Sequence, residues 1–107
     1  MSERKDILKL LADLKVEIRE ILEDKLVRIL LFGSYSRGDF STSSDVDLMI
    51  LVDGDLSREE REKIDDVIAE YSLVHDIVIS GIVYPSKIFR EYNTPFLLNV
   101  KEDGIKI

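Results

Sequence analysis

Two aspartates, two residues apart, are the side chains best placed to do chemistry in this sequence. Asp45 and Asp47 open the apolar run Leu48–Val52, which predicts a β-strand. Side chains at positions i and i+2 lie on one face of a strand, so both carboxylates should point the same way. Their charges repel, and a bound divalent cation would remove that cost. Oxygen ligands favour Mg²⁺ or Mn²⁺, although a solvated strand end would also explain the pair.

The turn before these aspartates has the composition of a phosphate-binding site. Gly33 and Ser34 follow the apolar run Ile29–Phe32. Glycine allows the backbone to approach a ligand or to adopt a positive φ. A short helix beginning at Ser34 would direct its first N–H groups at an anion, and the Ser34 hydroxyl would bond a phosphate or cap the helix. The Lys-Ser/Thr ending of a Walker P-loop is missing, so a different kind of triphosphate site is indicated.

Two polar residues between the turn and the aspartates are further candidates for nucleotide binding. Arg37 would neutralise triphosphate charge, or pair with Asp39 or another acid, and the sequence favours neither alternative. Ser44 would contact a phosphate or orient Asp45. Gly38 is expected to end the short helix in a left-handed conformation.

A third acid, Asp76, precedes another apolar run and completes the predicted site. We expect a strand over residues 76–84. Neighbouring strands lie about 4.8 Å apart, so Asp76 would reach the same metal ions if this strand borders the first acidic one. The alternative is an aspartate at the start of a strand, facing water. His75 is expected to be a surface residue rather than a catalytic base.

These residues resemble the polymerase beta superfamily of nucleotidyltransferases. The stretch GSYSRGDFSTSSDVDLMIL is similar, more closely, to the minimal nucleotidyltransferase (MNT) family, and the similarity extends over nearly the whole chain. The matching positions of the glycine–serine and acidic motifs are Gly33, Ser34, Arg37, Gly38, Ser44, Asp45, Asp47 and Leu48.

The resemblance implies an α/β (α+β) fold of the polymerase beta type, with a small mixed sheet packed against helices. It implies that Asp45 and Asp47 hold two Mg²⁺ ions (or Mn²⁺), that Asp76 binds one of them, and that the Gly33 backbone and Ser34 hold the β- and γ-phosphates of ATP. The α-phosphorus would be attacked, a nucleoside monophosphate transferred and pyrophosphate released.

The same resemblance implies a partner. MNT proteins are similar to antitoxins that pair with HEPN-domain ribonuclease toxins, and some transfer AMP to a toxin tyrosine. The chain leaves little length for gripping an acceptor, so the acceptor should be a separate folded protein. With all three acids present, we favour active AMPylation. The alternatives are an antitoxin that acts by docking alone, and nucleotidyl transfer to a small molecule or an RNA end.

Composition narrows the remaining possibilities. A chain of 107 residues predicts one domain, spanning 1–107. The absence of cysteine excludes thiolate zinc sites, and the single histidine argues against a histidine-based metal site. The net charge of −7 argues against strong nucleic-acid binding. No apolar run is long enough for a membrane span and no signal sequence is visible, so we expect a cytoplasmic protein.

Periodicity predicts the remaining elements. An amphipathic helix is expected over residues 3–24 and a strand, buried on both faces, over 26–32. Ser57 and Glu60 have the spacing of a capping box that begins a second helix. Gly81 suggests a bulge in the strand over 76–84. A short helix after Pro85, a last helix from Pro95 and an edge strand over 105–107 complete the prediction.

Overall fold

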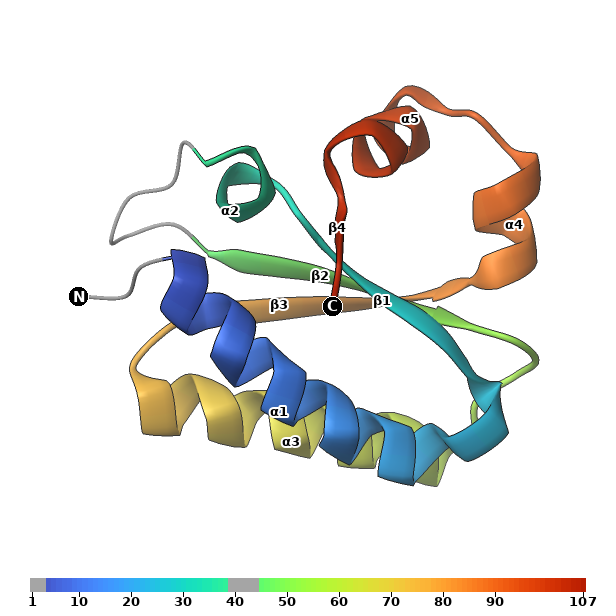
Figure 1. Ribbon diagram of the computed structural model, residues 1–107. Helices are drawn as coiled ribbons and strands as arrows, with labels where there is room; N and C mark the ends of the chain where they lie inside the picture. Colours follow the sequence, from blue (N-terminus) through green and yellow to red (C-terminus); the bar gives the residue numbers. More distant parts are fainter. Residues whose placement is uncertain (1–3, 39–44) are drawn as a thin grey trace.

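The computed structural model describes residues 4–38 and 45–107 as a four-stranded mixed sheet with helices on both of its faces (Figure 1). The strand order is β3-β2-β1-β4. The strands are β1 (Leu26–Phe32), β2 (Val46–Val52), β3 (Ile79–Pro85) and β4 (Ile105–Lys106). The predicted fold class, a small mixed sheet packed against helices, is confirmed.

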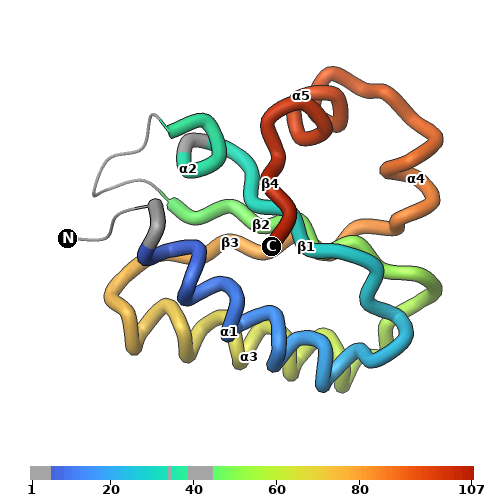
Figure 2. Tube along the Cα trace, viewed as in Figure 1, coloured from blue at the N-terminus to red at the C-terminus, as the bar shows by residue number. Residues whose placement is uncertain are grey.

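Two long helices cover one face of the sheet. They are α1 (Arg4–Leu22), which is followed by the 3₁₀ turn η1 (Glu23–Lys25), and α3 (Arg58–His75). Figures 1 and 2 show them lying side by side beneath the strands. The apolar residues of α1 recur at three- and four-residue spacing, which places them on one face toward the sheet. Those that are fully buried are Ile7, Leu11, Leu14, Ile18 and Leu22.

Three shorter helices lie on the other side: α2 (Ser34–Arg37), α4 (Ser86–Glu91) and α5 (Pro95–Asp103). The side chain of Thr94 caps α5 by accepting a hydrogen bond from the Leu97 N–H at 3.2 Å. This face has its own apolar core, formed by Leu30, Met49, Leu51, Leu97 and Val100. Alternate residues of β2 therefore contribute to two cores, one on each face of the sheet.

The helix α3 makes the connection that places β3 beside β2. Ser57 and Glu60 form the predicted capping box at its start, with hydrogen bonds of 3.1 and 2.8 Å. Because α3 carries the chain back along the sheet, β3 returns parallel to β2, whereas β1 and β4 are antiparallel to their neighbours.

The structure corrects three predictions about the strands. The strand predicted from residue 76 begins at Ile79, because α3 continues to His75 and Asp76 ends it in a left-handed conformation, with φ +52°. Gly81 forms no bulge. Its pairing with β2 is continuous, and a Cβ there would lie 2.7 Å from Cδ1 of Ile68 in α3. Finally, β1 was predicted to be buried on both faces, but only Ile29, Leu30 and Leu31 are buried, and Val27 and Arg28 are exposed.

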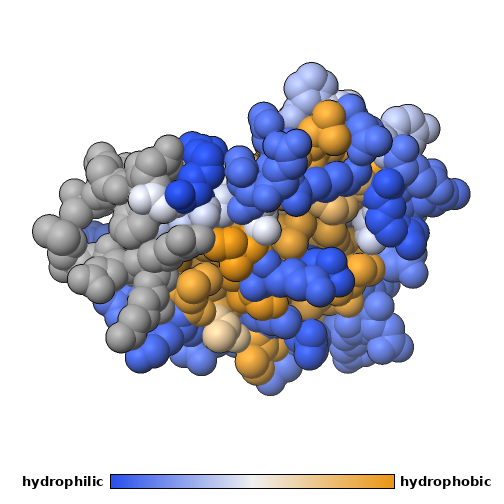
Figure 3. All heavy atoms as spheres, turned by 45° about the horizontal axis from the view of Figure 1, so that its top comes forward, coloured by the Kyte–Doolittle hydropathy of each residue, from blue (hydrophilic) through white to orange (hydrophobic). Residues whose placement is uncertain are grey.

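Apolar side chains also reach the surface. Figure 3 shows them gathered over α1 and the C-terminal segment, where Ala12, Val16 and Ile107 line a shallow hollow. Of the helices in the described ranges, none has both the length and the hydrophobicity that crossing a bilayer requires.

Candidate active site

The centre of the candidate site is a close approach between the glycine turn and the second aspartate. Gly33 ends β1 with φ +78°, a conformation that side chains rarely tolerate. A Cβ at this position would lie 2.5 Å from Oδ2 of Asp47, so only glycine fits against the carboxylate. Asp47 lies opposite Phe32 in the antiparallel β1–β2 ladder, which is why the turn after β1 meets it.

Hydrogen bonds from α2 fix the shape of this turn. The carbonyl oxygen of Gly33 accepts bonds from the hydroxyl of Ser36 at 2.9 Å and from the N–H of Arg37 at 3.2 Å. Gly38 follows with φ +85°, confirming the predicted end of the helix. Tyr35, which is 2% exposed, anchors the single helical turn in the core. The hydrogen bonds to Gly33 and the burial of Tyr35 therefore fix the conformation of this turn.

Asp45 and Asp47 form a repelling pair, as predicted from their spacing. Asp45 lies exposed just before β2, and Asp47 is partly buried within it. Burial and the neighbouring charge of Asp45 raise the pKa of Asp47, while the charge of Arg37 opposes that rise. Two carboxylates that repel each other are suited to binding a divalent cation. In magnesium sites, the phosphates of the substrate supply further ligands beside one or two carboxylates.

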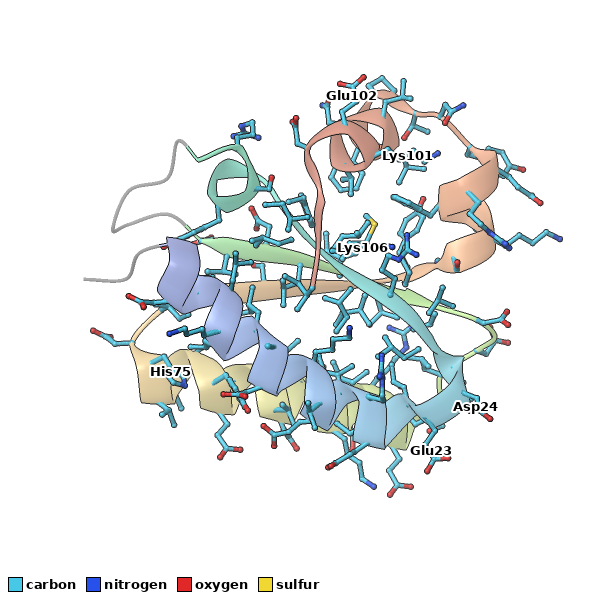
Figure 4. All side chains as sticks on the ribbon, viewed as in Figure 1. Glu23, Asp24, His75, Lys101, Glu102 and Lys106 are labelled. Carbon is cyan, nitrogen blue, oxygen red and sulfur yellow. The ribbon has the colours of Figure 1, made fainter. Side chains whose placement is uncertain are left out.

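Asp76 does not join this pair, which corrects the predicted set of three acids. It is an exposed residue that ends α3 in a left-handed conformation, three residues before β3 begins. Among the described residues, no three histidine or acidic side chains lie close enough to hold one metal ion. Figure 4 shows His75 at the same end of α3, beneath the sheet, where its ring packs against Tyr71 with centroids 5.7 Å apart.

The residue of β3 that faces the site is Ser80. It is the parallel partner of Asp47, so the two side chains share one face of the sheet. Sequence reasoning missed Ser80 because the strand was started three residues too early, which shifted its register. The strand can begin only after the chain leaves α3, and the local sequence pattern does not mark where the helix ends.

A cleft opens beside the turn, between it and α5. It has a volume of about 220 Å³ and is lined by Phe32, Gly33, Arg37, Phe96, Asn99, Val100 and Asp103. The rings of Phe32 and Phe96 meet edge to face with centroids 5.7 Å apart. The cleft gives an elongated ligand bound at Gly33 space to continue toward α5.

Three of the predicted nucleotide-binding groups cannot be placed in this geometry. Ser44 and Asp39, the second of which was considered as a partner for Arg37, lie in residues 39–44, outside the described ranges. The side chain of Ser34 is also outside the described part, although its backbone begins α2. The described site therefore consists of Gly33, Arg37, Asp45, Asp47 and Ser80.

A glycine–serine turn and a carboxylate pair on adjacent strands of a small mixed sheet define an enzyme that transfers nucleotidyl groups. Residues 15–106 match the family model described as the nucleotidyltransferase domain. The chain belongs to this nucleotidyltransferase family. A protein of Methanocaldococcus jannaschii, named as a candidate protein adenylyltransferase, is 40% identical over 102 residues, covering 95% of this chain and 99% of that protein.

Solved structures share the fold. A toxin–antitoxin crystallised with AMP-PNP is 22% identical, with a TM-score of 0.60, covering 88% of this chain and 69% of that one. A complex of a tri-AMPylated Shewanella oneidensis HEPN toxin with an MNT antitoxin is 23% identical in the matched chain, with a TM-score of 0.50, covering 96% of this chain and 66% of that one. At these identities the likeness establishes the fold alone.

Proposed function

We propose that this chain transfers AMP from ATP to a hydroxyl group of a partner protein, a tyrosine of a HEPN-type toxin, and thereby acts as an antitoxin. The contact between Gly33 and Asp47 carries the proposal, because it brings a phosphate-binding turn against a carboxylate that is unfavourably charged without a cation. The name of the 40%-identical relative supports a protein as the acceptor. The toxin–antitoxin structures supply the type of partner.

The donor set fits a magnesium ion. Asp45 and Asp47 would supply two oxygen ligands, and the phosphates of ATP the others, which is the usual balance for Mg²⁺. When bound, Mg²⁺ would neutralise phosphate charge and make the acceptor hydroxyl more acidic. Asp76 is left out of this set, because among the described residues no three acidic or histidine side chains are grouped closely enough to hold one metal ion.

In the proposed reaction the acceptor oxygen attacks the α-phosphorus of ATP. The bond from that phosphorus to the oxygen bridging to the β-phosphate breaks, and pyrophosphate leaves with the bridging oxygen. The hydroxyl proton passes to solvent or to the Asp47 carboxylate. The Gly33 backbone and the Arg37 guanidinium would hold the pyrophosphate as it leaves. Positioning and charge stabilisation supply most of the rate in such transfers.

The test is incubation with ATP labelled at the α-phosphate, Mg²⁺ and a HEPN-type protein. We expect label on the partner, found on tyrosine by mass spectrometry, and none when EDTA removes the metal. Label that appears on the partner without divalent metal would contradict the proposed metal site, and label on RNA would redirect the acceptor assignment.

Neutralisation by docking alone is the second candidate. The placement of Asp76 favours it, because two described carboxylates converge where three were expected. Tight binding of the HEPN-type protein that inhibits its ribonuclease activity, with no transferred label, would support this candidate over the first. We place either activity in the cytoplasm, where the ATP and the ribonuclease target are found.

A further inference from the structure

The outer edge of β3 is long and carries no charge. Within residues 4–38 and 45–107, β3 pairs with β2 alone, so one side of this seven-residue strand has no backbone partner. Its sequence is ISGIVYP. Proteins normally protect such an edge with lysine, an inward charge, a bulge or a very short strand. None of these devices occurs in β3, and only its last residue is proline.

The backbone of β3 is oriented to pair with another strand. The N–H of Val46 donates to the carbonyl of Val78 at 2.8 Å, which sets the alternation of the parallel ladder. Ser80 and Ile82 then direct their backbone groups toward β2, while Gly81 and Val83 direct theirs outward. The outward N–H of Ile79 donates to the hydroxyl of Ser72 at 3.3 Å, which marks the start of the accessible edge.

Apolar side chains along this edge are exposed next to the active site. Ile82 is 41% exposed and shares the face of Ser80 and therefore of Asp47, and Val78, just before the strand, is 58% exposed. The last turn of α3, at the same end of the strand, also exposes Leu73 and Val74, 83% and 70% exposed. Exposed apolar side chains beside an unpaired strand edge are suited to a protein acceptor.

We propose that an extended segment of the acceptor protein adds to β3 as a fifth strand and directs a tyrosine across Ser80 to the Asp45–Asp47 pair. This inference rests on the proposed function and names its docking mode. The added strand would lie two strand spacings from β2, about 9.6 Å. A tyrosine carries its hydroxyl beyond a full ring and can span much of that distance, whereas serine and threonine hydroxyls lie close to their own backbone.

Charge favours an acceptor over a second copy of this chain at the same edge. Each copy has a net charge of −7, so pairing two copies brings like charges together. An acceptor with a neutral or basic strand meets no such repulsion. The acceptor is also the protein whose side chains must reach the face of Asp47, and strand addition places alternate side chains there.

The substitution Val83→Pro tests the backbone part of this proposal. Proline removes one outward N–H and is tolerated where a strand edge faces solvent. Val83→Ala is the matched control, because it shortens the same side chain and keeps the N–H. With the HEPN-type protein of the transfer assay as the probe, we expect Val83→Pro to raise the KM for the acceptor at least tenfold beyond any change in Val83→Ala, with binding of Mg·ATP unchanged in both.

Ile82→Lys tests the side-chain part, with Val16→Lys, at an exposed apolar site on α1, as its control. Of these two variants, we expect only Ile82→Lys to weaken binding of the acceptor protein. When the partner is added, hydrogen exchange of the backbone amides of Gly81 and Val83 should slow. Equal transfer by all four variants, or unchanged exchange at β3, would overturn the docking mode while leaving the proposed function intact.

Two further outcomes separate the alternatives. Concentration-dependent dimers of this chain that Val83→Pro abolishes would assign the edge to a second copy and overturn the acceptor proposal. Absence of transfer by the unmodified chain, with Mg·ATP bound, would instead overturn the proposed function, and the docking mode for catalysis with it.

Discussion

Ser80 of β3 stands opposite Asp47 of β2 in a parallel ladder, on the face of the sheet that carries the candidate site. A hydroxyl therefore occupies the position on the neighbouring strand from which an acid could have reached the carboxylate pair. The described site has two carboxylates, and Ser80 lies on the strand to which we propose that the acceptor adds.

The first prediction concerns Ser80→Asp. An added carboxylate beside Asp47 should increase the repulsion in the metal-free protein and strengthen cation binding, because ligand charge tunes affinity. We expect a lower Tm in EDTA, a larger rise in Tm on adding Mg²⁺, and a half-saturating Mg²⁺ concentration about tenfold lower in the presence of ATP. Ser80→Ala is the control and should respond to Mg²⁺ as the unmodified protein does. A Tm of Ser80→Asp that is insensitive to Mg²⁺ would contradict this position.

The second prediction uses two glycines with similar backbones. Gly33 and Gly54 have φ of +78° and +87°, so alanine at either should cost about 1–2 kcal/mol of folding stability. A Cβ at Gly54 meets nothing within 4 Å, whereas one at Gly33 strikes the Asp47 carboxylate. Urea unfolding should show a loss in both variants, and nucleotidyl transfer should fall only in Gly33→Ala. Equal activity losses would show that strain, rather than displacement of Asp47, is responsible.

The third prediction separates Asp47 from Asp76. Asp47→Asn should lower the transfer rate by about a hundredfold or more, the scale observed when one electrostatic group of an active site is removed. Asp76→Asn should leave the rate unchanged. It should also fold normally, since asparagine tolerates the left-handed conformation that Asp76 adopts. Single-turnover kinetics measure both variants, and a severe loss in Asp76→Asn would restore the three-acid site.

The fourth prediction concerns pH and follows from the raised pKa of Asp47. Above the pKa of an unfolded aspartate the folded protein holds this proton more tightly than the unfolded chain does. Stability from this group is therefore present at low pH and is lost as pH rises through the higher folded pKa. Asp47→Asn removes this dependence, so its stability relative to the unmodified protein should be greater at pH 7 than at pH 3.5 in EDTA. Urea titrations at both pH values measure the difference, and the reverse order would contradict the raised pKa.

The fifth prediction tests the start of α3. The hydrogen bond from Lys25 and the Ser57 backbone lower the pKa of Glu60 to about 2. The stabilisation is therefore present above the pKa of an unfolded glutamate, near 4.5, and is lost as pH falls toward 2. Glu60→Gln should be less stable than the unmodified protein at pH 7 and nearly equal to it at pH 2. Chemical unfolding at the two pH values tests this; a constant difference would exclude the ionic contribution.

Much of the fold could be predicted because local patterns and tertiary packing agree. The heptad-like spacing in α1, the capping box at Ser57 and the apolar run of β1 each specified an element close to its observed bounds. The two-residue spacing of Asp45 and Asp47 likewise predicted a pair that the structure brings together.

The placement of Asp76 could not be predicted from the local pattern. The stretch around it reads equally well as the last turn of a helix or the first residues of a strand, and the choice was made by contacts distant in sequence. Ile64 and Ile68 pack α3 against the sheet, and Ser72 bonds the backbone of Ile79, so the helix persists to His75. The bulge predicted at Gly81 was wrong for a related reason. A glycine is needed there because Ile68 of α3 packs against the strand and leaves no room for a side chain.

The two rims of the sheet differ in length, seven residues in β3 and two in β4. A further strand can therefore pair along the edge formed by β3, whereas β4 offers only a short edge for backbone pairing. Any assembly built by adding strands to this protein should stop after one addition, giving a closed complex of fixed stoichiometry. A fibre needs two matching edges on every subunit, and the strands of the described residues supply only one long edge.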